Sequence, residues 1–234
     1  MLKLASQKPR YGYKRLHLLL RREGFIVNHK RVERLYRREK LSLRRKSYKK
    51  LRSSLRVALP VASIRNEAWS MDFVSDSLDN GRRFRALTII DNHTKEVPWI
   101  EIGFSLTGIH ISRLLTRLAQ THGKPRAITV DNGPEFISKA LAIWARENAV
   151  KLDFIEKGKP TQNAFIESFN GKFRDECLNQ TIFFTINDAK EKIELWRKEY
   201  NEERPHSALQ GMTPNEFANK EKIGREKIMA NVQF

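Results

Sequence analysis

The chain contains 234 residues, of which 40% are hydrophobic, and it carries a formal net charge of +18. This size favours one main domain with a sizeable core and a small satellite, and no apolar run approaches the roughly 18 residues of a membrane span. With no signal-peptide segment at the start, we expect a cytoplasmic protein. A lone Cys177 excludes an internal disulfide, and six scattered His residues form no zinc-like cluster, so any metal would bind carboxylates.

The positive charge is concentrated in the first quarter of the chain. Residues 1–65 hold 21 Lys and Arg against 3 Asp and Glu, whereas residues 66–234 hold 24 of each. A neutral body with a strongly basic N-terminal segment is typical of a protein that binds a polyanion through that segment. The alternative is a solvated basic tail.

Two short amphipathic helices are predicted within residues 1–40. Leu16, Leu19 and Leu20 share one helical face before Gly24, and a second helix follows Asn28 as its cap. Basic side chains on the outer faces suit a helix-turn-helix-like unit on DNA, although a helical hairpin with a hydrated basic face shows the same pattern. These basic residues are Lys30, Arg31, Arg34, Arg37 and Arg38. The following residues 41–66 are predicted to be a basic linker that follows a phosphate backbone without reading sequence.

The pattern then changes to strands. The runs "WSMDFVSD", "RFRALTIID" and "EVPWIEIG" predict an antiparallel meander, and Pro98 places the third strand at an edge because proline cannot donate a ladder hydrogen bond. Helices then alternate with the strands "RAITVD" and "KLDFI", and a last helix begins near residue 163. This order predicts an α/β fold with a ribonuclease H-like mixed sheet over residues 67–180. Residues 181–234 are predicted to form a helical C-terminal extension. In it, one apolar helical stripe is formed by Ala189, Ile193, Trp196 and Tyr200, and a capping box with proline at the first helical position is formed by Thr213, Pro214 and Glu216.

Three carboxylates stand at positions that suit a metal site. Asp131 ends a predicted strand, where α/β sheets collect ligands. Asp72 lies on the strand face opposite the bulky apolar residues, an unusual place for a carboxylate without a cation nearby. Glu167 lies on the last predicted helix. The nearby Asp76, Asp91 and Glu135 compete for the same role, and each acid taken singly has an ordinary structural explanation, a turn or a solvated surface.

Glu167 belongs to a polar stripe on its helix. Asn163, Glu167, Asn170 and Arg174 fall at helical spacing, beside an apolar stripe that would pack on the sheet. Three carboxylates without nitrogen or sulfur ligands suit Mg²⁺ or Mn²⁺, and two such ions can clamp the attacking and leaving oxygens of a displacement at phosphorus. The stripe beside them would contact a nucleic-acid backbone.

Several runs resemble a known family. "WSMDF", "DNGPEF" and "GKPTQNAFIESFNGKFRDECLN", followed by "YNEERPHSAL" and "TPNEFA", closely resemble the integrase-core transposases of bacterial insertion sequences. The resemblance is to the insertion-sequence-three type, the product of its second reading frame (OrfB), and it extends to about residue 218. That family uses an Asp, Asp, Glu triad with 35 residues between the last two, the spacing of Asp131 and Glu167 here. The resemblance therefore assigns the triad, and two Mg²⁺ ions that Mn²⁺ can replace, to Asp72, Asp131 and Glu167.

The resemblance also implies DNA contacts and partners. Arg174 falls where the family has a basic residue that approaches DNA, and the neighbouring residues Lys172, Lys159, Asn163 and Asn170 would help to position the strand. The DNA would be double-stranded: the terminal inverted repeats and a target. Pairing two ends implies a homodimer or a higher assembly. The family's working enzyme is typically a frameshift fusion whose upstream portion adds a leucine zipper, which is not evident here, so we expect an upstream-frame partner.

The predicted function is that of a metal-dependent DNA transposase. Hydrolysis of a phosphodiester at an end of the insertion sequence would free a 3′-OH, which would then join to another strand, in the bacterial cytoplasm in association with the nucleoid. One alternative is a catalytically idle DNA-binding regulator, or a truncated partner subunit of a longer fusion transposase. Another is a nuclease for RNA–DNA hybrids, which shares the fold but leaves the basic helices and the C-terminal motifs without a role.

Overall fold

A computed structural model describes residues 1–43, 62–156 and 163–232 of the chain. It contains two compact units. One comprises residues 1–58 together with 205–211, and the other comprises residues 59–204 together with 212–234.

The N-terminal unit is built from three short helices, α1 (Leu2–Gln7), α2 (Tyr13–Arg22) and α3 (His29–Arg38). Leu16 and Leu20 of α2 are buried, as are Val32 and Tyr36 of α3, so the predicted apolar stripes form the contact between these two helices. The predicted cap of the second helix is confirmed, because the Asn28 side chain accepts a hydrogen bond from the Lys30 N–H at 2.9 Å.

The larger unit contains a five-stranded sheet in the order β3-β2-β1-β4-β5. The first three strands pair antiparallel, whereas β1 with β4 and β4 with β5 pair parallel. The strands are β1 (Ala68–Ser77), β2 (Arg83–Asp91), β3 (Trp99–Gly103), β4 (Ala127–Val130) and β5 (Lys151–Phe154). This is the predicted ribonuclease H-like arrangement, and β3, which directly follows Pro98, is at an edge as expected.

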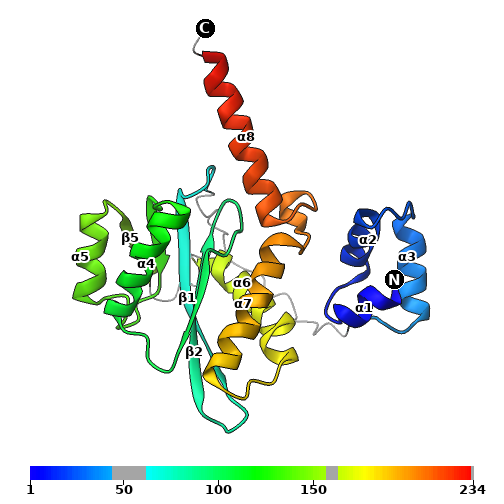
Figure 1. Cartoon of the computed structure of the whole chain (residues 1–234), viewed down its shortest axis with the longest axis horizontal. Helices are drawn as coiled ribbons and strands as arrows, with labels where there is room; N and C mark the ends of the chain where they lie inside the picture. Colours follow the sequence, from blue (N-terminus) through cyan, green and yellow to red (C-terminus); the bar gives the residue numbers. More distant parts are fainter. Residues whose placement is uncertain (44–61, 157–162, 233–234) are drawn as a thin grey trace. The chain divides into compact units, whose positions relative to one another are not determined.

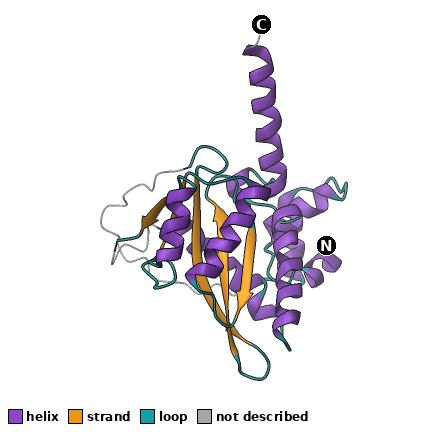
Figure 2. Cartoon of the chain, turned by 60° about the vertical axis from the view of Figure 1, so that its left-hand side comes forward, coloured by secondary structure: helices purple, strands orange, loops and turns teal. Residues whose placement is uncertain are grey.

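Helices cover both faces of the sheet (Figures 1 and 2). On one face α4 (Gly108–His122) and α5 (Lys139–Glu147) form a core with Trp69, Met71 and Leu87 of the strands. On the other face α6 (Ala164–Glu176) and α7 (Ile186–Glu202) form a second core with Val74, Ala86 and other strand residues. The alternation of side chains along β1 therefore sends consecutive residues into different cores.

The C-terminal part contributes to the second core. The predicted apolar stripe of α7 is confirmed, because Ala189, Ile193, Trp196 and Tyr200 are all buried beside α6. One 3₁₀ turn, Leu178–Gln180, lies between α6 and α7, and a second, Ser207–Leu209, lies between α7 and α8 (Pro214–Val232). The predicted capping box at its start is present: the Thr213 N–H donates to the Glu216 carboxylate at 2.7 Å, and the Glu216 N–H donates to the Thr213 hydroxyl at 3.2 Å. None of the described helices is both long enough and apolar enough to cross a membrane.

Candidate active site

The pairing of β1 with β4 brings two of the predicted acids together. Ser70 of β1 lies opposite Thr129 of β4 in a parallel ladder. Asp72 and Asp131 each lie two residues beyond this pair in the direction of the chain. They are therefore neighbours across the two adjacent segments of backbone. Asp131 lies directly after the end of β4, as predicted, and its Oδ1 accepts a hydrogen bond from the Gly133 N–H at 2.9 Å.

Both carboxylate oxygens of Asp72 are held by hydrogen bonds. Oδ1 accepts from the Phe73 N–H at 2.7 Å, and Oδ2 accepts from the Asn170 side-chain amide at 2.8 Å. Asn170 lies on α6, which packs against β1 and β2 on this face. The Asp72 side chain therefore points toward α6, on the face that the strand alternation predicted for it.

The amide of Asn170 is oriented by Thr88, a residue to which the sequence pattern assigned no functional role. The Thr88 hydroxyl lies 2.9 Å from Asn170 Oδ1 and 3.1 Å from the Asp72 carbonyl oxygen, and its single hydrogen serves these two acceptors. Because Oδ1 of Asn170 accepts from Thr88, its NH₂ group faces Asp72. Asn170 was predicted to contact DNA, and the structure places its amide on the Asp72 carboxylate.

The pKa of Asp72 is raised above its usual value. Burial of the carboxyl group is the largest cause, and the negative charges of Asp131 and Glu167 act in the same direction. The hydrogen bonds from the Phe73 N–H and from Asn170 oppose this effect. The three predicted acids thus interact electrostatically, and a cation among them would relieve the cost of keeping Asp72 charged.

Glu167 lies in the first turn of α6, where the helix dipole favours a negative charge. Its side chain is exposed, while Ile166, Phe169 and Phe173 on the adjoining face are fully buried and fix the helix on the sheet. The polar stripe predicted from Asn163 onward begins on the helix only at Glu167, one turn later. Asn163 is the residue before the helix and is only 4% exposed, and its Oδ1 accepts no hydrogen bond from the residues that the structure describes.

An open cavity of about 280 Å³ lies beside Asp72 and is also lined by Asn170, Gly171 and Arg174. Arg174 is exposed and donates a hydrogen bond to the Ser75 carbonyl oxygen at 2.8 Å, so its guanidinium lies along β1 near this opening. Lys172 is half-buried on the same helix. Lys159, the remaining predicted DNA contact of this region, lies outside the described residues.

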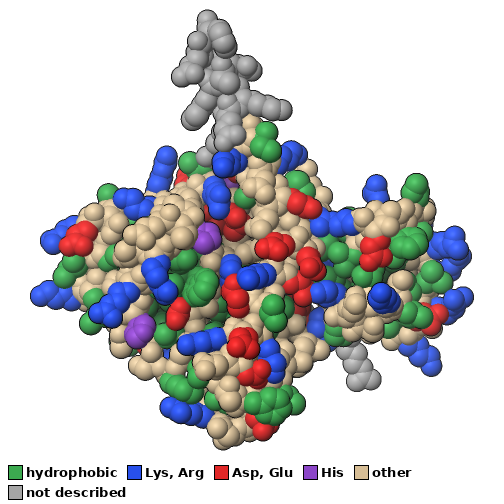
Figure 3. All heavy atoms as spheres, in the orientation of Figure 1, with side chains coloured by type: hydrophobic (Ala, Val, Ile, Leu, Met, Phe, Trp, Pro, Cys, Tyr) green, Lys and Arg blue, Asp and Glu red, His purple; other side chains and the backbone are tan. Residues whose placement is uncertain are grey.

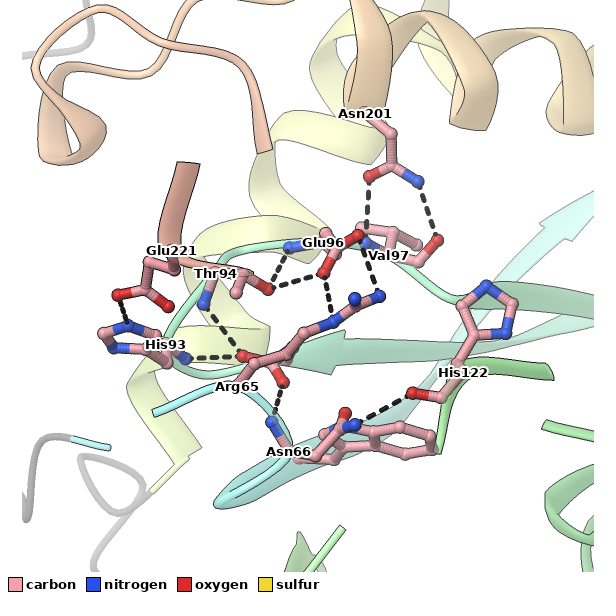
Figure 4. A network of polar contacts seen from close by, with 11 residues as sticks. Arg65, Asn66, His93, Thr94, Glu96, Val97, His122, Asn201 and Glu221 are labelled. Atoms are coloured by element: carbon pink, nitrogen blue, oxygen red, sulfur yellow. Dashed lines mark hydrogen bonds and ion pairs between the residues drawn. The ribbon is translucent and has the colours of Figure 1, made fainter. Parts of the chain in front are cut away.

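The competing acid Asp91 has a structural role. It is 2% exposed and accepts hydrogen bonds from the backbone N–H groups of Asn66, His93 and Thr94 at 2.7–2.8 Å. Figure 4 shows the polar contacts of this region, in which Arg65 pairs with Glu96 and the His93 ring lies against the Glu221 carboxylate. The hydrogen bonds to Asp91 thus close the loop between β2 and β3.

The other two competing acids are also engaged elsewhere. Glu135 forms a close ion pair with Arg85 of β2. Asp76 lies on the same face of β1 as Asp72, but four residues further along the strand, which is about 13 Å at 3.3 Å per residue. Its negative charge acts instead on the Cys177 thiol at the end of α6.

The donor set matches a hard divalent cation, but the side chains are not preassembled around one. Three carboxylates that repel one another suit Mg²⁺ or Mn²⁺ better than a softer metal. Within residues 1–43, 62–156 and 163–232, no three His, Cys, Asp or Glu side chains are gathered closely enough to hold an ion as they stand.

The basic residues predicted to bind DNA in the N-terminal unit lie on the surface of α3. Lys30, Arg31 and Arg34 are exposed, on the side of the helix opposite Val32 and Tyr36. Figure 3 shows Lys and Arg side chains along the surface of this unit. Their exposure is as expected, and their contact with DNA stays a prediction.

Family models match most of the chain. A model described as an integrase core domain matches residues 62–160, a second integrase core model matches residues 148–214, and an HTH-like domain matches residues 3–50. A protein of insertion element IS407 from Burkholderia multivorans, described as uncharacterized, is 49% identical over 94% of this chain and 79% of its own length. The chain belongs to the integrase-core transposases of bacterial insertion elements.

Other relatives agree with this assignment. The transposase is 44% identical to a protein of insertion element IS476 from Xanthomonas euvesicatoria, over 93% of this chain but only 63% of that protein. It is 26% identical to the transposase for insertion sequence element IS904 from Lactococcus lactis, over 91% of this chain and 88% of that one. Membership of this family makes the chain a polynucleotidyl transferase.

Solved structures share the fold. The transposase resembles a chain of the simian T-cell lymphotropic virus intasome in complex with PP2A regulatory subunit B56 gamma, with a TM-score of 0.59 and 15% identity over 92% of this chain and 73% of that one. The catalytic core domain of HTLV-2 integrase in complex with magnesium gives a TM-score of 0.51 and 18% identity over 67% of this chain and 98% of that one. At these identities the likeness concerns the fold alone.

Proposed function

We propose that this transposase cuts and rejoins phosphodiester bonds at the ends of an insertion element with Mg²⁺ bound by Asp72, Asp131 and Glu167. Asp72 carries the proposal, because it is half-buried, doubly hydrogen-bonded and under the repulsion of the other two acids. Bound Mg²⁺ would polarise the phosphate and activate the attacking oxygen, and Mn²⁺ would serve in its place. One ion or two fit this donor set.

The residues of the chain have distinct tasks in this scheme. Asn170 would hold the Asp72 carboxylate in one orientation beside the cavity, where it could serve as a metal ligand. Arg174, fixed on the Ser75 carbonyl, offers a positive charge to the DNA backbone at the rim of the same cavity. A first displacement by water frees a 3′-OH, and a second displacement by that hydroxyl joins two strands without a covalent enzyme intermediate.

The DNA partners follow from the same scheme. Lys30, Arg31 and Arg34 of α3 would bind the terminal inverted repeat, and the cavity beside Asp72 would receive the strand to be cut. Holding two ends at once requires at least a dimer. An upstream-frame partner with a leucine zipper would supply further contacts. The family membership does not favour a catalytically idle regulator.

The test uses a labelled duplex that carries the element's own terminal repeat, incubated with Mg²⁺, with Mn²⁺ and with a chelator. The wild type is expected to cut at the 3′ end and to join strands with either ion. Glu167→Gln is expected to lose at least about 100-fold in rate because the metal loses a ligand. Glu191→Gln, which removes an exposed carboxylate from α7, is the matched control and should keep wild-type activity.

The outcome distinguishes a self-sufficient transposase from a subunit that depends on a partner. Metal-dependent cleavage that disappears in Glu167→Gln supports a transposase with this triad. Binding of the duplex without cleavage, in wild type and variant and with both metals, contradicts the proposal that the chain acts alone and favours a partner-dependent subunit.

A further inference from the structure

Arg85 makes two contacts at the edge of the α4/α5 face of the sheet. It lies on β2, opposite Ser75 of β1, and its Nη1 donates to Glu135 Oε1 in a close ion pair. Its guanidinium carbon lies 3.8 Å from the centre of the Phe73 ring. Both members of the ion pair are shielded from water, with 33% of the Arg85 side chain and 18% of the Glu135 side chain exposed. Such a pair is stronger than one in open solvent.

Glu135 belongs to the segment that begins with Asp131. A Cβ atom added to Gly133 would lie 3.0 Å from Asp131 Oδ1 and 3.3 Å from Glu135 Oε2, so both carboxylates border the same small space. Two negative groups this close compete for any cation. Burial favours the neutral form of Glu135, but the hydrogen bond from Arg85 and its charge outweigh burial and lower the pKa of Glu135.

The same contacts reach the other strand of the site. Phe136 follows Glu135, is buried, and its ring centre lies 5.3 Å from that of Phe73. Phe73 directly follows Asp72 and donates its backbone N–H to the Asp72 carboxylate. Arg85 and Phe136 thus hold the segment after β4 against the β1 residue that adjoins Asp72.

We propose that Arg85 and Glu135 form a positioning pair, which fixes the segment carrying Asp131 and keeps the Glu135 carboxylate out of the metal site. The inference rests on the proposed role of Asp131 as a metal ligand. If Arg85 is neutralised, Glu135 loses its partner while remaining beside Asp131, and it becomes a fourth carboxylate that draws the metal away from the productive position. A neutral residue 135 removes that competition.

The test compares Arg85→Gln, Glu135→Gln and the double variant with the wild type in the full chain. Arg83→Gln is the matched control, because Arg83 lies two residues earlier on the same strand face and is exposed. Four quantities are measured: the rate of DNA cleavage, the Kd for the terminal duplex, the Kd for Mn²⁺ without DNA, and the melting temperature. Asp131→Asn is included in the Mn²⁺ titration.

Arg85→Gln is expected to cut about 10–100-fold more slowly, the usual effect of removing a group that positions a metal ligand. Its Kd for DNA should stay within about twofold of wild type, and it should bind Mn²⁺ at least as tightly, because a carboxylate has been released beside the site. The double variant should recover most of the lost rate, because the competing charge is gone and the two amide side chains can still hydrogen-bond to each other. Glu135→Gln alone should be nearly wild type, since its amide oxygen still accepts from Arg85, and Arg83→Gln should match the wild type throughout.

The inference is overturned if Glu135→Gln gives no rescue of Arg85→Gln, or if Arg85→Gln loses Mn²⁺ affinity together with melting temperature, the result of a purely structural role. These failures are distinguishable from failure of the triad. If Asp131→Asn binds Mn²⁺ as the wild type does, the proposed function is wrong and the inference falls with it.

Discussion

The ion pair between Glu176 and Arg204 joins the end of α6 to the segment after α7. Arg204 Nε and Nη2 donate to the two Glu176 oxygens at 2.7 and 2.6 Å, and the side chains are 7% exposed for Glu176 and 2% exposed for Arg204. Glu176→Gln would remove the negative charge that forms this bidentate pair with the buried guanidinium. Removal of one partner from such a pair costs about 3–5 kcal/mol, a large fraction of the roughly 5–15 kcal/mol that stabilises a domain.

Urea unfolding of the metal-free protein measures this loss. With a denaturant slope of about 2 kcal/mol per molar, a cost of about 4 kcal/mol lowers the midpoint of the larger unit by about 2 M. The loss also frees the C-terminal end of the helix that carries Glu167, so cleavage should fall as well. The double variant Glu176→Met/Arg204→Met should be more stable than Glu176→Gln, because apolar side chains at both positions remove the cost of burying a charge.

Asp188→Asn provides the matched control. Asp188 pairs with Lys192 at 2.8 Å, but the two side chains are 25% and 37% exposed, so water screens the pair and its loss should shift the midpoint much less. The reasoning is refuted if Glu176→Gln shifts the midpoint no more than Asp188→Asn, or if the double Met variant is less stable than Glu176→Gln. Either result would mean that the buried pair is dispensable or that the site is well hydrated.

Three further predictions concern other parts of the molecule. Asn170→Leu removes the amide donor from Asp72 and should slow cleavage about 10–100-fold with unchanged DNA affinity, measured by rate and by binding titration. Burial lowers the pKa of Lys95 to about 8 from its usual 10.5, so the charged form opposes folding and this group adds stability as pH rises from about 8 toward 10.5. Lys95→Met should lack that alkaline gain in melting temperature relative to wild type, and an equal pH dependence would contradict it. In the N-terminal unit, the double variant Lys30→Ala/Arg31→Ala should weaken DNA binding and reduce the slope of log K against log salt by about 2, while an unchanged slope would show that these side chains do not contact phosphates.

The secondary structure and much of the site were predictable because they depend on local patterns. Alternation in "WSMDF" placed Asp72 opposite the apolar residues, and the spacing of Glu167, Asn170 and Arg174 placed them on one side of α6. Both follow from the geometry of a single element. The caps at Asn28 and Thr213 were equally local, since each involves residues two or three positions apart.

The partners across elements were not predictable in the same way. The interaction of Asn170 with Asp72 depends on how α6 lies on β1, and that of Thr88 depends on the strand register, which pairs it with Asp72. The Asn80-Gly81 pair marks the turn between β1 and β2, and counting residues outward from it could have indicated which residues of the two strands pair. The turn alone leaves more than one register open. Glu135 competed with Asp131 in the sequence because nothing local indicates that Arg85, fifty residues earlier, neutralises it.

The candidate site draws its three acids from elements of unequal rigidity. Asp72 is the most constrained, since it lies within a central strand, both its oxygens are hydrogen-bonded, and the helix that contacts it is anchored by Phe169 and Phe173 in the core. Asp131 follows a strand that pairs with β1 over only three residues, so its position depends on side-chain contacts such as that between Arg85 and Glu135. Glu167 is exposed and near the start of its helix. A metal site must hold its ligands within about 0.5 Å of the productive geometry. The side-chain movement needed to reach that geometry is therefore expected to increase from Asp72 through Asp131 to Glu167. In the proposed scheme, the two aspartates would therefore be held by their neighbours before the cation binds, and Glu167 would be the last ligand to join the site.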